Sequence, residues 1–139
     1  MFTIRKFQKG EESTLRDIFF NTVRHVNIKD YSELQVKAWA PDYYDQSEWC
    51  KRISAIDPFV AVLDNEIVGY ADVQDDGYID HFFCHRDHQG EGIGKALMQK
   101  LILTGQQNGN SRLYSHASIT AKPFFEYFGF QMIKPQQVN

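Results

Sequence analysis

The sequence has little cysteine and no long apolar run. Cys50 and Cys84 are its only cysteines, too few for a disulfide framework and without the spacing of a metal site. Two isolated thiols are typical of a reducing compartment, so we expect a cytoplasmic protein that binds no metal. No segment approaches the ~18 consecutive apolar residues of a membrane span. Residues 1–10 are polar and alternating, unlike a signal peptide.

An excess of positive charge is also lacking. The chain has 15 Lys and Arg against 18 Asp and Glu, with no basic block, and its net charge is −3. Proteins that bind nucleic acid through its phosphates need a basic surface, so we expect no nucleic-acid partner. Aromatic residues are plentiful, with eleven Phe and seven Tyr, and this predicts an aromatic core. The length of 139 residues suits one domain, expected over residues 1–139.

Hydrophobic periodicity predicts an α/β (α+β) protein in which strands and helices are interspersed. A short turn is expected at Asp64-Asn65. We expect strands over residues 2–7, 59–63, 67–73, 78–85, 112–116 and 130–133. We expect helices over residues 14–26, 31–39, 46–53, 93–107 and 120–128.

Three glycines alternate directly before the long helix predicted at residues 93–107. They are Gly90, Gly92 and Gly94. A helix N-terminus carries unpaired backbone N–H groups and partial positive charge, and glycine lets a ligand approach the backbone closely. An ordinary strand-to-helix turn rarely needs three alternating glycines. This junction therefore predicts a phosphate site.

Two common nucleotide motifs do not fit the glycine-rich segment. A Walker loop needs a glycine where Gln89 stands and a hydroxyl where Ala96 stands, and that hydroxyl would bind magnesium. The dinucleotide fingerprint fits Gly90 and Gly92 but needs a third glycine in place of Lys95. Both nucleotide interpretations are therefore excluded.

The motif that fits is Gln/Arg-x-x-Gly-x-Gly/Ala, present at residues 89–94 as QGEGIG. Residues 121–130, AKPFFEYFGF, are similar to an A-x-x-F-Y-E-x-x-G-F segment, and one predicted helix and one strand separate the two. Together they resemble the GNAT superfamily of N-acetyltransferases. The resemblance covers residues 58–133 well and residues 1–57 only in the order of elements.

The resemblance implies a fold, a co-substrate and an activity. The fold is a mixed, mostly antiparallel sheet of six to seven strands flanked by about four helices, with two strands splayed apart at the acetyl-CoA site. The activity is transfer of an acetyl group from acetyl-CoA, by direct attack in a ternary complex, to a primary amine of a small molecule or peptide. The alternatives are a non-catalytic coenzyme A-binding module and a dimeric interaction protein.

The resemblance also assigns the residues that contact the cofactor. The diphosphate is expected at Gln89, Gly90, Glu91, Gly92, Ile93, Gly94 and Lys95. The pantetheine arm and the acetyl group are expected along the backbone of Phe82, Phe83 and Cys84. Burial of Cys84 as a small apolar residue is a simpler interpretation than a nucleophilic role. Ser118 stands where relatives often have an asparagine that touches coenzyme A.

The catalytic base is expected at Asp80 or His81, just before the acetyl-binding positions. Adjacent residues of a strand point to opposite faces, so only one of them can face the cleft. Histidine suits neutral pH better, which favours His81. For the acceptor side we expect His25, Tyr31 and Trp39 to contact the amine substrate.

One position departs from the family pattern. The tyrosine that commonly serves as general acid is replaced by Phe125, which has no ionisable group. Tyr127 lies two residues further, some 200° around the helix, and cannot replace it. Tyr114, His116 or a water molecule remain as acids, or no protein acid is used. Phe125 is still expected beside the cofactor.

Overall fold

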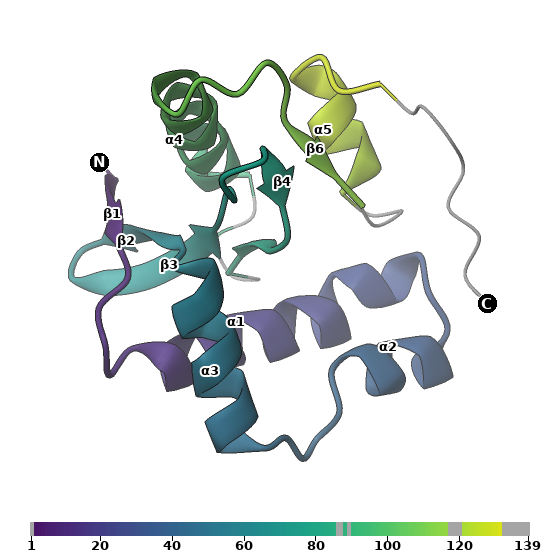
Figure 1. Ribbon diagram of the computed structural model, residues 1–139. Helices are drawn as coiled ribbons and strands as arrows, with labels where there is room; N and C mark the ends of the chain where they lie inside the picture. The colour runs from purple at the N-terminus through teal and green to yellow at the C-terminus, as the bar shows by residue number, and fades with distance from the viewer. Residues whose placement is uncertain (1, 86–87, 89, 117–120, 132–139) are drawn as a thin grey trace.

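The computed structural model describes residues 2–85, 88, 90–116 and 121–131 (Figure 1). Five α-helices, one 3-10 helix and six strands lie in this part of the chain. The strands are β1 (Thr3–Lys6), β2 (Phe59–Leu63), β3 (Glu66–Ala71), β4 (Tyr78–Ile79), β5 (Phe82–Cys84) and β6 (Tyr114–Ser115). The helices are α1 (Glu12–His25), η1 (Asn27–Lys29), α2 (Glu33–Trp39), α3 (Gln46–Ile56), α4 (Ile93–Gln107) and α5 (Lys122–Tyr127).

The strands form two sheets. Strands β1, β2, β3 and β5 make an antiparallel sheet in that order, with Thr3 opposite Val62 and Tyr70 opposite Phe83. Strand β4 pairs instead with β6, in parallel. The prediction of one six- to seven-stranded sheet is therefore wrong for the described residues, although the mixed, mostly antiparallel α/β class is confirmed.

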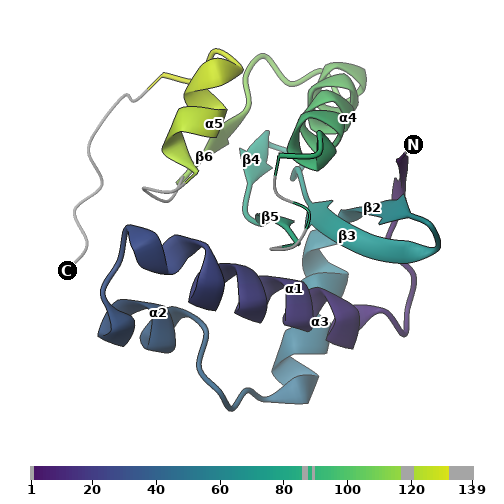
Figure 2. The same cartoon turned by 180° about the vertical axis from the view of Figure 1, so that it is seen from behind.

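Helices cover both faces of the larger sheet (Figures 1 and 2). Helices α1, α2 and α3 lie on one face, where Leu15, Phe19 and Ile53 pack with Tyr70 of β3. Helices α4 and α5 lie on the other face, where buried side chains pack around Leu97. Apolar residues at spacings of three and four along α1 and α4 supply these buried faces. The site described below lies where the two layers meet at β5.

Local sequence sets several of the element boundaries. The turn between β2 and β3 places Asp64 and Asn65 at positive φ, a conformation these residue types tolerate, and this turn was predicted. Ser32 accepts a hydrogen bond from the backbone N–H of Gln35 and so caps α2. Helix α3 extends to Ile56, beyond the predicted residue 53, and ends at Asp57 in the left-handed conformation.

Three predicted strands differ from the structure. The strand expected over 78–85 is broken at Asp80 and His81, which separates β4 from β5. The strand expected over 112–116 is limited to residues 114–115. Phe130 and Gln131 are not in a strand, and residues 132–133 of the last predicted strand lie outside the described residues. Long-range pairing, which sequence periodicity does not report, decides the first two of these cases.

Close packing at Gly69 fixes the start of α4 against the sheet. A Cβ atom at Gly69 would lie 2.9 Å from Cγ2 of Ile93 and 3.1 Å from the carbonyl oxygen of Phe83. Glycine therefore lets the first turn of α4 pack directly on β3 beside β5. The glycine-rich loop is held next to the edge of the larger sheet as a result.

Candidate functional site

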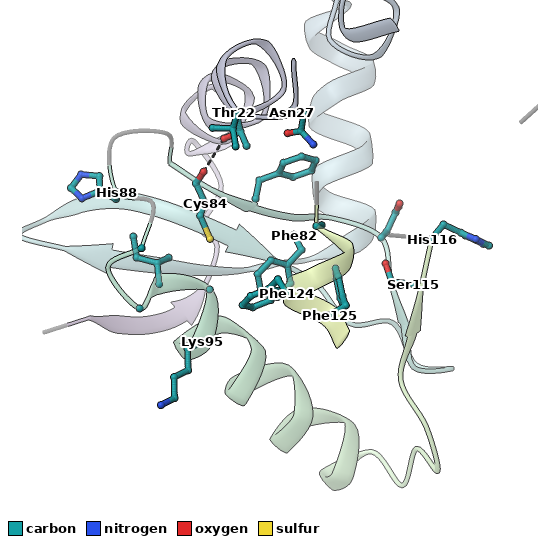
Figure 3. Close-up of a pocket in the computed structure, with 18 of the residues that line it drawn as sticks. Thr22, Asn27, Phe82, Cys84, His88, Lys95, Ser115, His116, Phe124 and Phe125 are labelled. Atoms are coloured by element: carbon teal, nitrogen blue, oxygen red, sulfur yellow. Dashed lines mark hydrogen bonds between the residues drawn. The ribbon is translucent and has the colours of Figure 1, made fainter. Parts of the chain in front are cut away.

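A cavity of about 400 Å³ lies between β5, the N-terminal end of α4, α5 and the C-terminal end of α1 (Figure 3). Its lining is mostly apolar, with few polar groups, as is usual for a small-molecule site. The described residues that line it are Thr22, Val26, Asn27, Trp39, Asp80, Phe82, Phe83, Cys84, His88, Gly90, Gly92, Ile93, Gly94, Lys95, Ser115, His116, Ala121, Phe124 and Phe125.

The glycine-rich loop presents an open helix N-terminus to this cavity. Gly90 and Gly92 have φ of +79° and +88°, a backbone conformation that residues with a side chain rarely adopt. A Cβ atom at Gly90 would meet nothing within 4 Å, and one at Gly92 would meet only Phe2, at 3.7 Å. Gly92 is the N-cap of α4, and no side chain of the described residues caps the helix there. Backbone N–H groups and open space thus fit an anionic ligand such as a diphosphate.

Gly94 has a packing role. A Cβ atom there would lie 3.0 Å from Phe124 and 3.7 Å from Sγ of Cys84, so the glycine allows α5 to approach α4.

The other residues predicted to bind the diphosphate are placed as follows. Lys95 lines the cavity, but its side chain points away from it (Figure 3). Glu91 Oε2 lies 3.0 Å from Nδ1 of His88. Gln89 and Ser118 lie outside the described residues.

Strand β5 is the edge of the larger sheet in the described part of the chain. The backbone of Asp72 donates to the carbonyl of His81, and that of His85 donates to the carbonyl of Val68, so residues 81 and 85 face β3. Alternate residues of a strand direct their N–H and C=O groups to opposite sides. The backbone groups of Phe82 and Cys84 therefore face away from β3, while those of Phe83 face it.

The splay expected at the acetyl-CoA site is present. Strand β4 pairs with β6 through Tyr78 and Ile79, whereas β5 pairs only with β3 among the described residues. Ser115 and His116, at the end of β6, line the cavity across from Phe82 (Figure 3). The outward backbone of Phe82 thus faces the cavity between the two sheets.

A hydrogen bond from α1 fixes the far end of β5. The hydroxyl of Thr22 donates to the carbonyl of Cys84 over 2.9 Å, and both residues line the cavity (Figure 3). The backbone of Cys84 was predicted to bind the cofactor, but its carbonyl already accepts this hydrogen bond from the protein. Sequence reasoning missed Thr22, because the contact joins residues 62 positions apart.

We expect Thr22→Val to destabilise the fold by about 1–2 kcal/mol, because it removes this buried hydrogen bond while nearly preserving shape. The midpoint of thermal unfolding should fall by about 3–8 °C. Thr22→Ser is the matched control, because it keeps the hydroxyl. Equal unfolding midpoints for the two variants would show that this hydrogen bond adds no net stability.

Asp80 and His81 form the strand break, and the side chain of Arg52 contacts both of them. Asp80 lines the cavity and is the only carboxylate among the described residues that do so. Its Oδ2 lies 3.7 Å from Nη2 of Arg52. His81 is 5% exposed, outside the cavity, with its ring 6.1 Å from that of Phe19 and 6.0 Å from that of Trp49.

Both ring nitrogens of His81 have protein partners. Nε of Arg52 donates to Nε2 over 3.2 Å, so the proton of the neutral ring is on Nδ1, 2.9 Å from the hydroxyl of Tyr70. Burial lowers the pKa of His81 to about 4, the Asp80 carboxylate raises it and the Arg52 guanidinium lowers it. His81 is therefore neutral at pH 7.

Groups that could protonate a leaving thiolate are few around the cavity. Phe125 lines it and is 4% exposed, with the ring of Phe82 at 5.8 Å. Tyr127 is 80% exposed and is not among the lining residues. The hydroxyl of Tyr114 donates to Asp76, whereas His116 lines the cavity. Of the sequence candidates, the structure thus brings only His116 to the site.

The expected acceptor residues are only partly brought together. Trp39 lines the cavity, 6.3 Å from the ring of Phe83. Tyr31 packs against Trp39 at 5.7 Å without lining the cavity, and His25 is exposed elsewhere. Asn27, which sequence reasoning missed, is 5% exposed and lines the cavity from η1. Its position directly after the predicted helix over residues 14–26 and beside His25 was the signal that could have found it.

Neither a membrane span nor a metal site is found among the described residues. No described helix is long and apolar enough to cross a membrane. Within the same residues, no group of three or more His, Cys, Asp or Glu side chains could bind a metal ion.

Comparison with known proteins agrees with this geometry. A family model described as an acetyltransferase (GNAT) domain matches residues 27–139. The chain is 36% identical, over 98% of its length and 85% of the relative's, to a protein named uncharacterized N-acetyltransferase YafP, of Escherichia coli (strain K12).

Solved structures show the same fold. A GCN5-related N-acetyltransferase from Rhodopseudomonas palustris, whose name adds "Aminotransferase, Class-II", superposes with a TM-score of 0.86 at 27% identity, covering 91% of this chain and 79% of that one. The PaiA N-acetyltransferase of Thermoplasma acidophilum, solved with coenzyme A, gives 0.75 at 16% identity, over 99% of this chain and 93% of its own. The protein with this glycine-rich loop and splayed strand edge belongs to the GNAT family of N-acetyltransferases.

Proposed function

We propose that residues 1–139 act as one domain that transfers an acetyl group from acetyl-CoA to a primary amine of a small molecule or peptide. One observation carries this proposal: a single cavity joins the open N-terminus of α4, the outward edge of β5 and the carboxylate of Asp80. The PaiA relative is solved with coenzyme A, which supports the same co-substrate here. The two cysteines, neither of which forms a disulfide, support a cytoplasmic location.

We infer one orientation for the cofactor in the cavity. The diphosphate would accept hydrogen bonds from backbone N–H groups at residues 90–95, where Gly90 and Gly92 leave open space. The pantetheine arm would run along the outward backbone of Phe82, with Phe83 and Cys84 also lining the wall. The acetyl group would then lie near Asp80, just before the start of β5.

The chemistry requires a free lone pair on the amine. An amine with a pKa near ~10.4 is neutral in only about one molecule in 2,500 at pH 7, which corresponds to roughly 4–5 kcal/mol. We propose that Asp80 attracts the ammonium form and receives its proton, directly or through water. His81 has less support as the base because it lies outside the cavity with both ring nitrogens paired.

The transfer itself is direct. The amine nitrogen attacks the thioester carbonyl, so an N–C bond forms and the C–S bond breaks. Outward backbone N–H groups of β5 would stabilise the oxyanion that forms in between. The thiolate of coenzyme A, with a reference pKa near ~8.5, leaves and takes a proton from water or from His116.

We expect Cys84→Ala to keep kcat within about threefold, because the thiol is no nucleophile here. Burial raises the pKa of Cys84 to about 12, so about one thiol in 10⁵ is ionised at pH 7. Initial rates against both substrates should give intersecting lines, as a ternary complex requires. Parallel lines, with loss of turnover in Cys84→Ala, would indicate an acetylated cysteine and contradict direct attack.

A non-catalytic coenzyme A-binding module is the second candidate, favoured by Phe125 where the family pattern commonly has a tyrosine. Release of free thiol from acetyl-CoA over a broad panel of amines tests the proposal, with coenzyme A affinity measured in parallel. Turnover with a primary amine supports the enzyme. Binding without turnover across the panel supports the module, and absence of both contradicts the assigned site.

A further inference from the structure

The break between β4 and β5 is a bulge with one extra residue. The backbone of Asp72 donates to the carbonyl of His81, and that of Gln74 donates to the carbonyl of Tyr78. The first strand thus advances two residues, from 72 to 74, where the second advances three, from 78 to 81. An extra residue in one strand leaves backbone amides without their usual partners in the ladder.

The side chain of Asp72 supplies the missing acceptor. Its Oδ1 accepts hydrogen bonds from the backbone N–H of Asp80, over 3.1 Å, and from that of His81, over 2.5 Å. Its Oδ2 accepts a short hydrogen bond from the side chain of Gln74, which also donates to the carbonyl of Ile56. Asp72 is fully buried, so this carboxylate is built into the fold.

The bulge decides which side chain enters the cavity. Before it, Ile79 packs in the layer of α4 and α5, and after it Phe82 and Cys84 pack in that same layer. Regular alternation would have placed residues 79 and 81 on one face. His81 instead lies among the aromatic rings on the opposite face, and Asp80 lines the cavity.

We propose that Asp72 is a positioning residue for acetyl transfer: its carboxylate holds the amides of Asp80 and His81 and so directs the Asp80 side chain into the cavity. This inference rests on the proposed function, in which Asp80 handles the proton of the amine. Asp72 does not line the cavity and acts through the backbone of its neighbours.

The ionisation of Asp72 provides a second way to test the inference. Burial raises the pKa of Asp72 to about 6, while the hydrogen bonds from His81, Gln74 and the Asp80 backbone lower it and the Asp80 carboxylate raises it. Tyr70, Tyr78, Arg52 and His81 are the other titratable or charged groups around it. A carboxylate whose folded pKa is raised is destabilising when ionised, so its contribution to stability falls as pH rises from about 4 to about 6.

The kinetic test compares Asp72→Asn with Asp72→Ala. Asparagine keeps an oxygen for both amides, so kcat should stay within about threefold of the wild-type value. Alanine removes the oxygen, and we expect kcat to fall about tenfold while KM for acetyl-CoA is unchanged, because the loop and α4 are untouched. Assays are run well below the unfolding midpoint of each variant. Equal kcat in the alanine and asparagine variants would overturn the inference.

A spectroscopic arm uses only the wild type and Asp72→Asn, so it does not depend on a destabilised protein. The amide proton resonances of Asp80 and His81 should shift with an apparent pKa near 6 in the wild type and lose that step in Asp72→Asn. Amide resonances that show no such step would overturn the inference. If the wild type acetylates no amine while the step is present, the proposed function fails, but the hydrogen bonds of Asp72 to the amides of Asp80 and His81 stand.

Discussion

Gly92→Trp should weaken the binding of coenzyme A by about 100-fold or more, which is a loss of about 2.7 kcal/mol. The indole would project into the open space beside the N-terminus of α4, where a Cβ atom meets only Phe2. It would block the approach of the diphosphate to the backbone N–H groups. Isothermal titration of coenzyme A into each protein measures the effect.

Gly109→Trp is the matched control for this substitution. Gly109 follows the other end of α4, has φ of +77°, and has open space around its Cβ position. Both tryptophans therefore impose a similar backbone strain, of about 1–2 kcal/mol for a left-handed residue. The control should lose stability but keep its affinity for coenzyme A. Equal affinity in the two variants would contradict the placement of the diphosphate.

Asp80→Asn should lower kcat by about 100-fold or more, the usual contribution of a general base. The substitution preserves shape and leaves the backbone hydrogen bond to Asp72 in place. It breaks an ion pair with Arg52, whose side chain is 58% exposed, so little stability should be lost. Steady-state kinetics at saturating acetyl-CoA measure the change, and KM for acetyl-CoA should stay near its wild-type value.

His81→Phe separates the two candidate bases. Phenylalanine keeps an aromatic ring against Phe19 and Trp49 but removes the hydrogen bonds to Arg52 and Tyr70. We expect a lower unfolding midpoint and a fall in kcat of no more than about tenfold. A large loss of kcat in His81→Phe, with near-normal turnover in Asp80→Asn, would instead identify His81 as the base.

The long helices and the glycine-rich loop could be predicted from local sequence. Apolar residues at helical spacing predicted α1 and α4, and the dipeptide Asp64-Asn65 predicted the turn between β2 and β3. Gly90 and Gly92 were expected to leave the backbone open to a ligand, and in the structure little or nothing surrounds their Cβ positions. Each of these features depends on residues within a few positions of one another, which is why a single sequence reveals them.

The orientation of Asp80 and His81 could not be predicted in the same way. Alternation along a strand predicts that Asp80 and His81 face opposite sides, but the side that each one faces depends on the bulge. The bulge in turn depends on the carboxylate of Asp72, eight or nine residues away on the neighbouring strand. The contact of Thr22 with Cys84, across 62 positions, is likewise a property of the packed fold.

The departure at Phe125 also takes a physical form in the structure. Phe125 packs against Phe82 and lines the cavity, so this position serves the shape of the site. A thiolate leaving group has a much lower pKa than an alkoxide, so loss of one acid affects the reaction less than loss of the base would. A protein with phenylalanine at this position can therefore keep the rest of the site without the family's tyrosine.

A crystal structure of the protein with coenzyme A tests the central claim most directly. The account predicts diphosphate oxygens about 2.7–3.2 Å from backbone nitrogens at the start of α4, and the sulfur beside the outward edge of β5 near Asp80. Well-defined coenzyme A bound elsewhere, with the N-terminus of α4 facing only solvent, would contradict it.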